Sequence, residues 1–205
     1  YLESLGHHII DLVPGLIGLK GKQSFFADIA GIRADVKVNL YIESTHVCSE
    51  QGELQLTNYG ISGIPVFQLS RVATRALSEQ KKVYATLNFV PFWEKEQCLT
   101  YFKERFKKAD EKHIREALIG FFPEKLIPVL LEESHIKAAK YANRLQTEEL
   151  ERFIDTVQGL RVDITDWNTF DTAQVTAGGV DTDEIDAENM ESKLCPGLYF
   201  AGEMV

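Results

Sequence analysis

Residues 32–43 read IRADVKVNLYIE, and apolar and polar side chains alternate through this stretch without a break. Successive side chains of a strand point to opposite faces of a sheet, so the alternation predicts one long strand with a buried face and a wet face. A half-solvated sheet is typical of antiparallel pairing. This stretch therefore predicts a fold built on an antiparallel sheet.

Neighbouring stretches extend this sheet. A polar turn is expected over 44–52, and residues 53–57 alternate again, so they are the predicted hairpin partner. Alternation returns at 83–89 and at 160–165. Upstream, residues 9–19 are apolar but interrupted by proline and glycines, which favours an edge or bulged strand.

The middle of the chain has helical periodicity instead. From Pro91 onward apolar residues recur at intervals of three and four, and they do so again behind Thr147, which we expect to cap the last helix. Internal prolines divide this region into four or five short helices. The sequence thus predicts an α+β fold, in which an antiparallel, β-rich and barrel-like domain over 1–90 and 159–180 is interrupted by a small helical subdomain over 91–158.

The charge balance bears on the partners. The chain has 22 basic and 31 acidic residues, a net charge of -9 at pH 7, and its basic residues are scattered. We therefore expect no nucleic-acid partner. No apolar stretch approaches the roughly 20 residues that span a bilayer, and the first residues lack the pattern of a signal peptide. A cytoplasmic location without a membrane partner is the expectation.

The cysteine, histidine, serine and acidic residues of the sequence form no recognisable metal-binding or nucleophilic motif. The three cysteines are far apart in sequence, which favours reduced thiols over a disulfide framework or a zinc site. The acidic segment 181–193 lacks the ligand spacing of a calcium loop, so we expect a solvated connection and no metal. No Ser-His-Asp, Cys-His or paired-histidine constellation can be assembled, and no self-contained catalytic apparatus is predicted.

Residues 57–65 read TNYGISGIP and precede a segment with helical periodicity. Gly60, Ser62 and Gly63 would place a flexible turn at a helix N-terminus, where exposed N–H groups and the helix dipole form an anion site. In the alternative interpretation Ser62 caps the helix, Pro65 occupies its first turn and nothing binds. Local pattern favours the cap.

A second stretch with chemical character covers residues 174–205. It contains QVTAGGV at 174–180 and GLYFAGE at 197–203. An apolar run that ends in Gly202 and Glu203 is typical of a buried strand that meets a nucleotide, because the glycine permits close approach and the acid accepts hydrogen bonds from sugar hydroxyls. The alternative is a core strand followed by a surface turn.

These motifs, in this order, resemble the bacterial BaiN-like flavoproteins, which are also described as aminoacetone-oxidase-like NAD(P)/FAD-dependent oxidoreductases. Residues 5–14 are similar to the passage of that family from its FAD domain into its insert, and the resemblance covers essentially the whole chain. It implies an FAD-binding domain, a β-rich domain inserted into it, and a small helical domain inserted in turn. The chain would be the insert region plus, over 181–205, a returning strand at the start of the C-terminal part of a truncated FAD-binding domain.

The resemblance also implies roles for individual residues. Thr176, Gly178 and Gly179 would form a turn near the isoalloxazine, while Gly202 would approach the flavin and Glu203 would accept from a ribityl hydroxyl. From the insert, Gly60, Ser62 and Gly63 would face the substrate cleft.

FAD, with NAD(P)H as a candidate reductant, would supply the hydride chemistry of the full-length protein. The partners would be a small-molecule substrate and the remaining FAD-binding domain. The sequence begins at Tyr1 without a methionine and ends at Val205 directly after the suspected site, so both ends look cut. Because the glycine-rich first βαβ unit of the family has no counterpart in this sequence, the fragment alone is expected neither to bind FAD nor to be active.

Two positions depart from the family pattern. Asn58 stands where members often have a histidine, so no proton-transfer role is carried over, and Ile64 separates Gly63 from the proline that follows directly in many members. The competing hypothesis is a non-catalytic protein-binding module, based on the acidic balance and the short helices. The catalytic residues, the substrate, the choice of NADH or NADPH and the oligomeric state are left open by the sequence.

Overall fold

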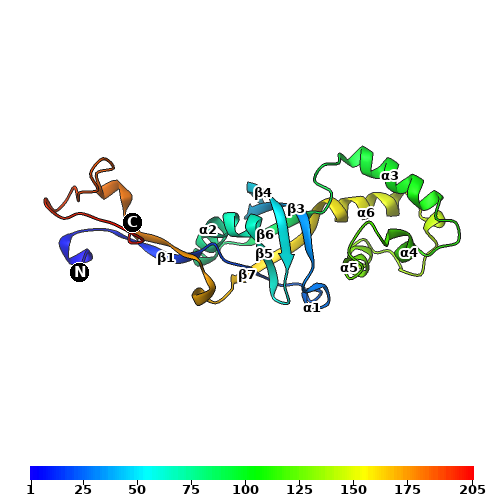
Figure 1. Cartoon of the computed structure of the whole chain (residues 1–205), viewed down its shortest axis with the longest axis horizontal. Helices are drawn as coiled ribbons and strands as arrows, with labels where there is room; N and C mark the ends of the chain where they lie inside the picture. Colours follow the sequence, from blue (N-terminus) through cyan, green and yellow to red (C-terminus); the bar gives the residue numbers. More distant parts are fainter.

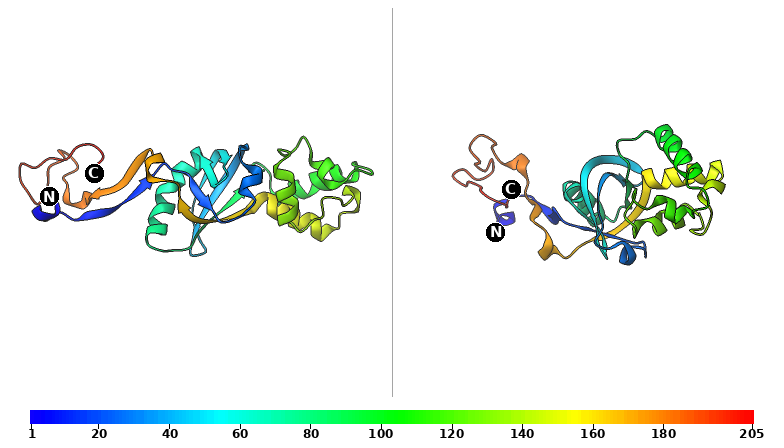
Figure 2. Two further views of the ribbon diagram at one scale, coloured as in Figure 1. Left: turned by 90° about the horizontal axis from the view of Figure 1, so that it is seen from below. Right: turned by 45° about the vertical axis from the view of Figure 1, so that its right-hand side comes forward.

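The computed structural model describes residues 1–205 as an elongated molecule (Figure 1). A small terminal lobe carries both chain ends, a two-stranded ribbon leads from it to a β-barrel, and a helical lobe lies at the far end (Figures 1 and 2). One continuous hydrophobic core of 40 buried residues runs through the barrel and the helical lobe. The predicted α+β class with a barrel-like antiparallel domain is confirmed.

Six antiparallel strands close the barrel in the order β2-β5-β4-β3-β6-β7. They are β2 (Leu19–Gly21), β3 (Arg33–Ile42), β4 (Thr45–Leu56), β5 (Gly60–Gly63), β6 (Val83–Asn88) and β7 (Leu160–Trp167), with the single-turn helix α1 (Phe26–Ile29) between β2 and β3. In β3 the alternation has the expected result: Val36, Val38 and Leu40 are buried, Asp35 and Lys37 are exposed, and Asn39 is half-buried. No helix of the chain is both long and apolar enough to cross a membrane.

The hairpin of β3 and β4 corrects the predicted turn. The chain reverses at Glu43 and Ser44, which have φ values of 47° and 71°, and β4 begins at Thr45, so a turn over 44–52 is wrong. The first half of β4 is exposed or half-buried on both faces, and its side chains therefore carry no core pattern. Backbone pairing with β3 determines this half of the strand, which side-chain alternation does not reveal.

Helix α2 (Ile64–Ser78) begins directly after β5 and packs against the barrel and β1. Pro65 lies in its first turn as predicted. The predicted cap is wrong, because Ser62 is a buried residue of β5 paired with Gln55, and Gly63 occupies the N-cap position without a side-chain hydrogen bond. The expected flexible turn at Gly60–Gly63 is therefore a paired strand.

The helical lobe is inserted between β6 and β7. It consists of α3 (Lys95–Lys107), α4 (Ile114–Leu118), α5 (Leu126–Glu133), the 3-10 turn η2 (Ala142–Arg144) and α6 (Thr147–Gly159). Leu87 pairs with Leu160, so the two ends of the insertion lie side by side on the barrel. Gln146, rather than the predicted Thr147, caps α6 through a capping box with Glu149.

The ribbon consists of β1 (Ile9–Gly15) and β8 (Val175–Val180), which pair antiparallel. Its register shifts between Ile10 and Val13, which confirms the predicted bulge, but the strand ends at Gly15 and Leu19 already belongs to β2. The turn expected at Thr176, Gly178 and Gly179 is wrong, because all three residues belong to β8. Their backbone conformation is nevertheless unusual, with φ values of 108° at Gly178 and 126° at Gly179.

The terminal lobe holds little regular structure. It contains the 3-10 turns η1 (Glu3–Leu5) and η4 (Thr182–Glu184), and a third turn, η3 (Phe170–Thr172), precedes the ribbon. A small second core joins Val180, Ile185 and Phe200. The strand expected before Gly202 is absent, since only an isolated bridge between Glu191 and Tyr199 forms in this segment.

Candidate functional site

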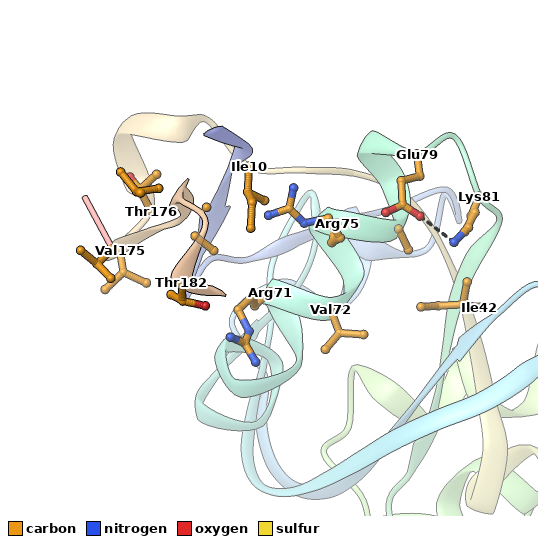
Figure 3. A pocket seen from close by; sticks show the side chains of 15 residues that line it. Ile10, Ile42, Arg71, Val72, Arg75, Glu79, Lys81, Val175, Thr176 and Thr182 are labelled. Carbon is orange, nitrogen blue, oxygen red and sulfur yellow. Dashed lines mark ion pairs between the residues drawn. The ribbon is translucent and has the colours of Figure 1, made fainter. Parts of the chain in front are cut away.

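A pocket of about 750 Å³ lies between α2 and the ribbon (Figure 3). Helix α2 contributes Arg71, Val72, Arg75 and Ala76 to its wall. The ribbon contributes Ile10 from β1 and, from β8, Val175, Thr176, Ala177, Gly178 and Val180. The rim is completed by Ile42, Glu79, Lys81, Thr182 and Val205. The pocket is thus mainly apolar. Its charged lining residues are Arg71 and Arg75 of α2 and, directly after the helix, Glu79 and Lys81.

The charges along α2 are unequally neutralised. Lys81 Nζ lies 2.6 Å from Glu79 Oε2, and the hydrogen bond from Lys81 lowers the pKa of the Glu79 carboxyl (Figure 3). Arg75 donates from Nη1 to the carbonyl oxygen of Asp11 at 2.8 Å, which ties α2 to the ribbon but leaves the guanidinium charge without a carboxylate. Arg71 is exposed, and its guanidinium group makes no hydrogen bond or ion pair within the chain. The pocket therefore has an excess of positive charge.

Two of the predicted cofactor residues, Thr176 and Gly178, line this pocket, whereas Gly179 does not. A Cβ on Gly178 would lie 2.4 Å from the Asp11 carbonyl oxygen, and one on Gly179 would lie 2.5 Å from that of Met204. Both glycines are thus required by backbone packing inside the chain. Close approach of a ligand is not needed to explain them.

The predicted cleft residues Gly60, Ser62 and Gly63 lie outside the pocket, in β5. A Cβ on Gly60 would meet the Leu19 carbonyl oxygen at 2.2 Å, and one on Gly63 would meet that of Glu53 at 2.5 Å. These glycines let β5 close the barrel between its two neighbours, and the structure does not bring them together with the pocket residues.

Gly202 and Glu203 lie on the surface of the terminal lobe. Both are exposed, Gly202 has a φ of 83°, and a Cβ added to it would meet nothing within 4 Å. The positive φ accounts for a glycine at position 202, whereas no neighbouring atom of the chain requires one. Gly202 and Glu203 do not line the pocket, although Val205 two residues later does.

One cluster is absent from the sequence-based prediction. His7 is buried, its Nδ1 lies 2.8 Å from Glu184 Oε2, and its Nε2 lies 2.9 Å from Ser192 Oγ. The side chains of Ser192, His7 and Glu184 are thus hydrogen-bonded in series, so the prediction that no serine, histidine and acid constellation can be assembled is wrong. No local motif reveals it, because His7 and Ser192 are separated by 185 positions.

The cluster fastens the terminal lobe. Ser192 is only 5% exposed, and its Oγ accepts hydrogen bonds from the backbone N–H groups of Leu194 and Cys195. A hydroxyl so engaged is not presented to a substrate, and a structural role follows. No group of three or more histidine, cysteine, aspartate or glutamate side chains is placed to hold a metal ion.

Comparison with protein families matches the barrel together with its helical insertion. A family model described as HI0933-like protein barrel and H2TH domain matches residues 13–175, which include all six barrel strands, α2 and the helical lobe. The chain belongs to this family. The resemblance to BaiN-like flavoproteins is confirmed by this match and by the relatives of the chain.

Three curated relatives of the chain have two different names. The chain is 41% identical to the 3-dehydro-bile acid delta(4,6)-reductase of Clostridium scindens over 203 residues, which are 99% of this chain and 50% of that protein. It is 25% identical to the ribosomal RNA dihydrouridine synthase of Escherichia coli over 99% of the chain and 48% of that protein. The Haemophilus influenzae protein of the same name is 26% identical over 82% of the chain and 40% of its own length. The chain spans about half or less of the curated relatives it matches.

Proposed function

We propose that this chain is the insert region of an FAD-dependent oxidoreductase, and that the pocket between α2 and the ribbon is part of the substrate cleft. The observation that carries this proposal is the 41% identity to a reductase across 99% of the chain. The absence of a catalytic triad facing a cavity agrees with it, because bound FAD would supply hydride transfer while the chain binds and orients the substrate.

Residues at the end of the terminal lobe fit a flavin. Gly202 offers an exposed backbone with free space on its Cα side, and the exposed carboxylate of Glu203 is available to accept hydrogen bonds from hydroxyl groups. Thr176 and Gly178 would border the flavin from the ribbon, at the pocket that Val205 also lines. Gly179, which does not line the pocket, stays a predicted cofactor residue, and its backbone packs beside Met204.

The surface near the termini favours docking to the rest of an FAD-binding domain. Large exposed apolar side chains are concentrated in the ribbon, the terminal lobe and the segment before β8, and include Tyr1, Leu12, Phe170, Val175, Met190, Leu194, Tyr199 and Met204. Clustered apolar exposure of this kind marks an interaction surface. The helical lobe at the opposite end exposes fewer such residues.

The proposed reaction is hydride addition from NAD(P)H, through FAD, to an unsaturated small organic molecule. The relative named as a bile acid reductase suggests a conjugated steroid ketone as the first substrate to try. The test is to mix the complete gene product with FAD, NADH or NADPH and such a ketone without oxygen, and to follow nucleotide oxidation and the gain of two hydrogens in the product. A protein that binds FAD but reduces no such ketone would contradict the substrate, and one that binds no flavin would contradict the class.

A second candidate is reduction of uridine in RNA, because two relatives named as ribosomal RNA dihydrouridine synthases match 99% and 82% of the chain. The helical lobe carries nearly equal numbers of interleaved acidic and basic residues, which disfavours a surface that follows phosphates. Adding unmodified ribosomal RNA to the same assay separates the two substrates.

The remaining alternative is a non-catalytic protein-binding module. Replacing Glu203 with Ala in the complete protein tests it, because the flavin hypothesis predicts weaker FAD retention. An unchanged flavin content would contradict the role of Glu203, and a complete protein without any flavin would favour the binding module.

A further inference from the structure

We propose that the pocket between α2 and the ribbon receives the adenosine end of NADPH, that Arg71 holds its 2′-phosphate, and that the chain thereby selects NADPH over NADH. The inference rests on the proposed function, because it names the reductant that this cleft admits. NADPH and the substrate then occupy the cleft in turn, since the nucleotide reduces FAD and leaves before the substrate is reduced.

The charged side chains of the pocket carry two surplus positive charges. Arg71, Arg75 and Lys81 are basic, and Glu79 is the only acidic side chain in the lining. The whole chain has a net charge of -9, so this surplus is local to the pocket. A phosphate monoester carries about -1.5 to -2 charges at neutral pH, whereas a carboxylate carries a single charge. A phosphate group is therefore the anion whose charge matches the pocket.

The two arginines of α2 differ in what they can offer a ligand (Figure 3). Arg75 donates to the Asp11 carbonyl oxygen at 2.8 Å and is thereby held against the ribbon. The guanidinium group of Arg71 has no partner in the chain, so its N–H groups are available for parallel hydrogen bonds to phosphate oxygens. Arg71 is thus the direct ligand of the phosphate, and Arg75, one helical turn further along α2, adds positive charge nearby.

The free groups of the pocket distinguish NADPH from NADH. In dinucleotide-binding folds a carboxylate typically binds the 2′-hydroxyl of the NADH ribose, whereas an arginine accommodates the 2′-phosphate of NADPH. The single carboxylate of this lining, Glu79, accepts a hydrogen bond from Lys81 at 2.6 Å and is already engaged. Because the Arg71 guanidinium is the group left free, the pocket suits the phosphate and offers no unengaged carboxylate to the hydroxyl.

The remainder of the pocket suits the adenine ring. Its apolar wall consists of Val72 and Ala76 of α2 and of Ile10, Val175 and Val180 of the ribbon. A flat base that lies against this wall buries apolar surface, which is favourable. Val205 also lines the pocket, three residues after Gly202, which is proposed to approach FAD. A dinucleotide bound with its adenosine at Arg71 can therefore direct its nicotinamide end toward the flavin.

Two nucleotide fragments test the site without the reaction. Adenosine 2′,5′-bisphosphate carries the extra phosphate of NADPH and adenosine 5′-monophosphate lacks it, and titration calorimetry measures the binding of each to the complete gene product. We expect the bisphosphate to bind about tenfold or more tightly, and Arg71→Gln to remove most of this difference, because charge-assisted hydrogen bonds are lost. Arg33→Gln, which removes an exposed barrel arginine paired with Glu53, is the matched control and should keep the difference.

The preference between reductants is measured on the same preparations without oxygen, by following the loss of flavin absorbance after mixing with NADPH or NADH. NADPH should reduce the unaltered protein about tenfold or more efficiently than NADH, and Arg71→Gln should lower this ratio by about the same factor. Equal efficiency of the two nucleotides, no binding of the bisphosphate, equal affinity for the two fragments, or an unchanged ratio in Arg71→Gln would each overturn the inference.

The inference and the proposed function fail in different ways. A flavin-containing protein that NADH reduces as well as NADPH would refute the phosphate site alone, whereas a complete protein that binds no flavin would refute the proposed function. Arg71 is exposed and lies outside the residues proposed for FAD, so Arg71→Gln should keep its flavin. If that variant fails to fold, the comparison of the two fragments on the unaltered protein still decides the inference.

Discussion

At the scale of single residues, the glycines of β8 are explained by the neighbouring backbone. Gly178 lies opposite the register shift of β1, where the carbonyl oxygens of Ile10 and Asp11 approach within 3 Å of the position that a Cβ would take. Its φ of 108° is also a conformation that side-chain-bearing residues rarely adopt. The ribbon therefore depends on this glycine whether or not a cofactor is bound.

Gly178→Ala should consequently destabilise the ribbon by about 2 kcal/mol or more, through backbone strain and overlap with Asp11. Limited proteolysis at the ribbon and thermal unfolding would measure the effect. Gly159→Ala is the control, because a Cβ there meets nothing within 4 Å and Gly159 ends a helix. Equal behaviour of the two variants would contradict the packing explanation.

Glu149 gives a pH-dependent prediction. Hydrogen bonds from Lys140 and from the Gln146 backbone lower the pKa of the Glu149 carboxyl in the folded chain. A lowered folded pKa means that the stabilisation is present above the ordinary pKa of glutamate, near 4.3, and is lost as the pH falls through the folded value. Glu149→Gln should therefore reduce the free energy of unfolding by about 1 kcal/mol at neutral pH.

The difference between Glu149→Gln and the unaltered chain should disappear in strong acid, which denaturant unfolding at several pH values would measure. Glu148→Gln is the matched control, since Glu148 is exposed and makes no ion pair. A deficit in Glu149→Gln that persists when carboxyl groups are protonated would contradict the electrostatic cause.

At the scale of elements, a strand is predictable from the sequence when one of its faces is buried in the core. The alternation of 32–43 gives β3 nearly residue by residue because one of its faces lies in the core. β4 is longer than predicted because its first half has no buried face, and β5 is missed because backbone pairing holds it. Long-range contacts such as those of His7 with Glu184 and Ser192 leave no local pattern, and neither does the pocket, whose walls lie in distant segments.

The helical lobe behaves as an insertion into a barrel that is closed without it. Leu87 and Leu160 are paired across β6 and β7, so residues 88–159 can be replaced by a two-residue Asn-Gly turn of the kind that joins antiparallel strands. The shortened chain should keep its β-sheet circular dichroism and lose helical signal. It should also melt at a lower temperature, because one continuous core joins the lobe to the barrel. Complete unfolding of the shortened chain would show that the barrel cannot form without the lobe.

At the scale of the whole molecule, the parts lie in a row and the pocket lies where the ribbon meets the barrel (Figure 1). Arg75 holds the two sides of the pocket together through the Asp11 carbonyl, and exposed apolar residues gather at the end that carries both termini. The barrel and helical lobe thus form a scaffold that presents one wall of a cleft. We expect a flavin-bearing domain to dock on the ribbon and terminal lobe and to form the opposite wall.

The visible absorption spectrum of the complete gene product, with the FAD content of the purified protein, tests this account most directly. The account predicts flavin absorbance bands and close to one FAD per chain, reduced in part by Glu203→Ala and retained in Arg71→Gln. A colourless, folded protein that cannot be reconstituted with FAD would contradict it.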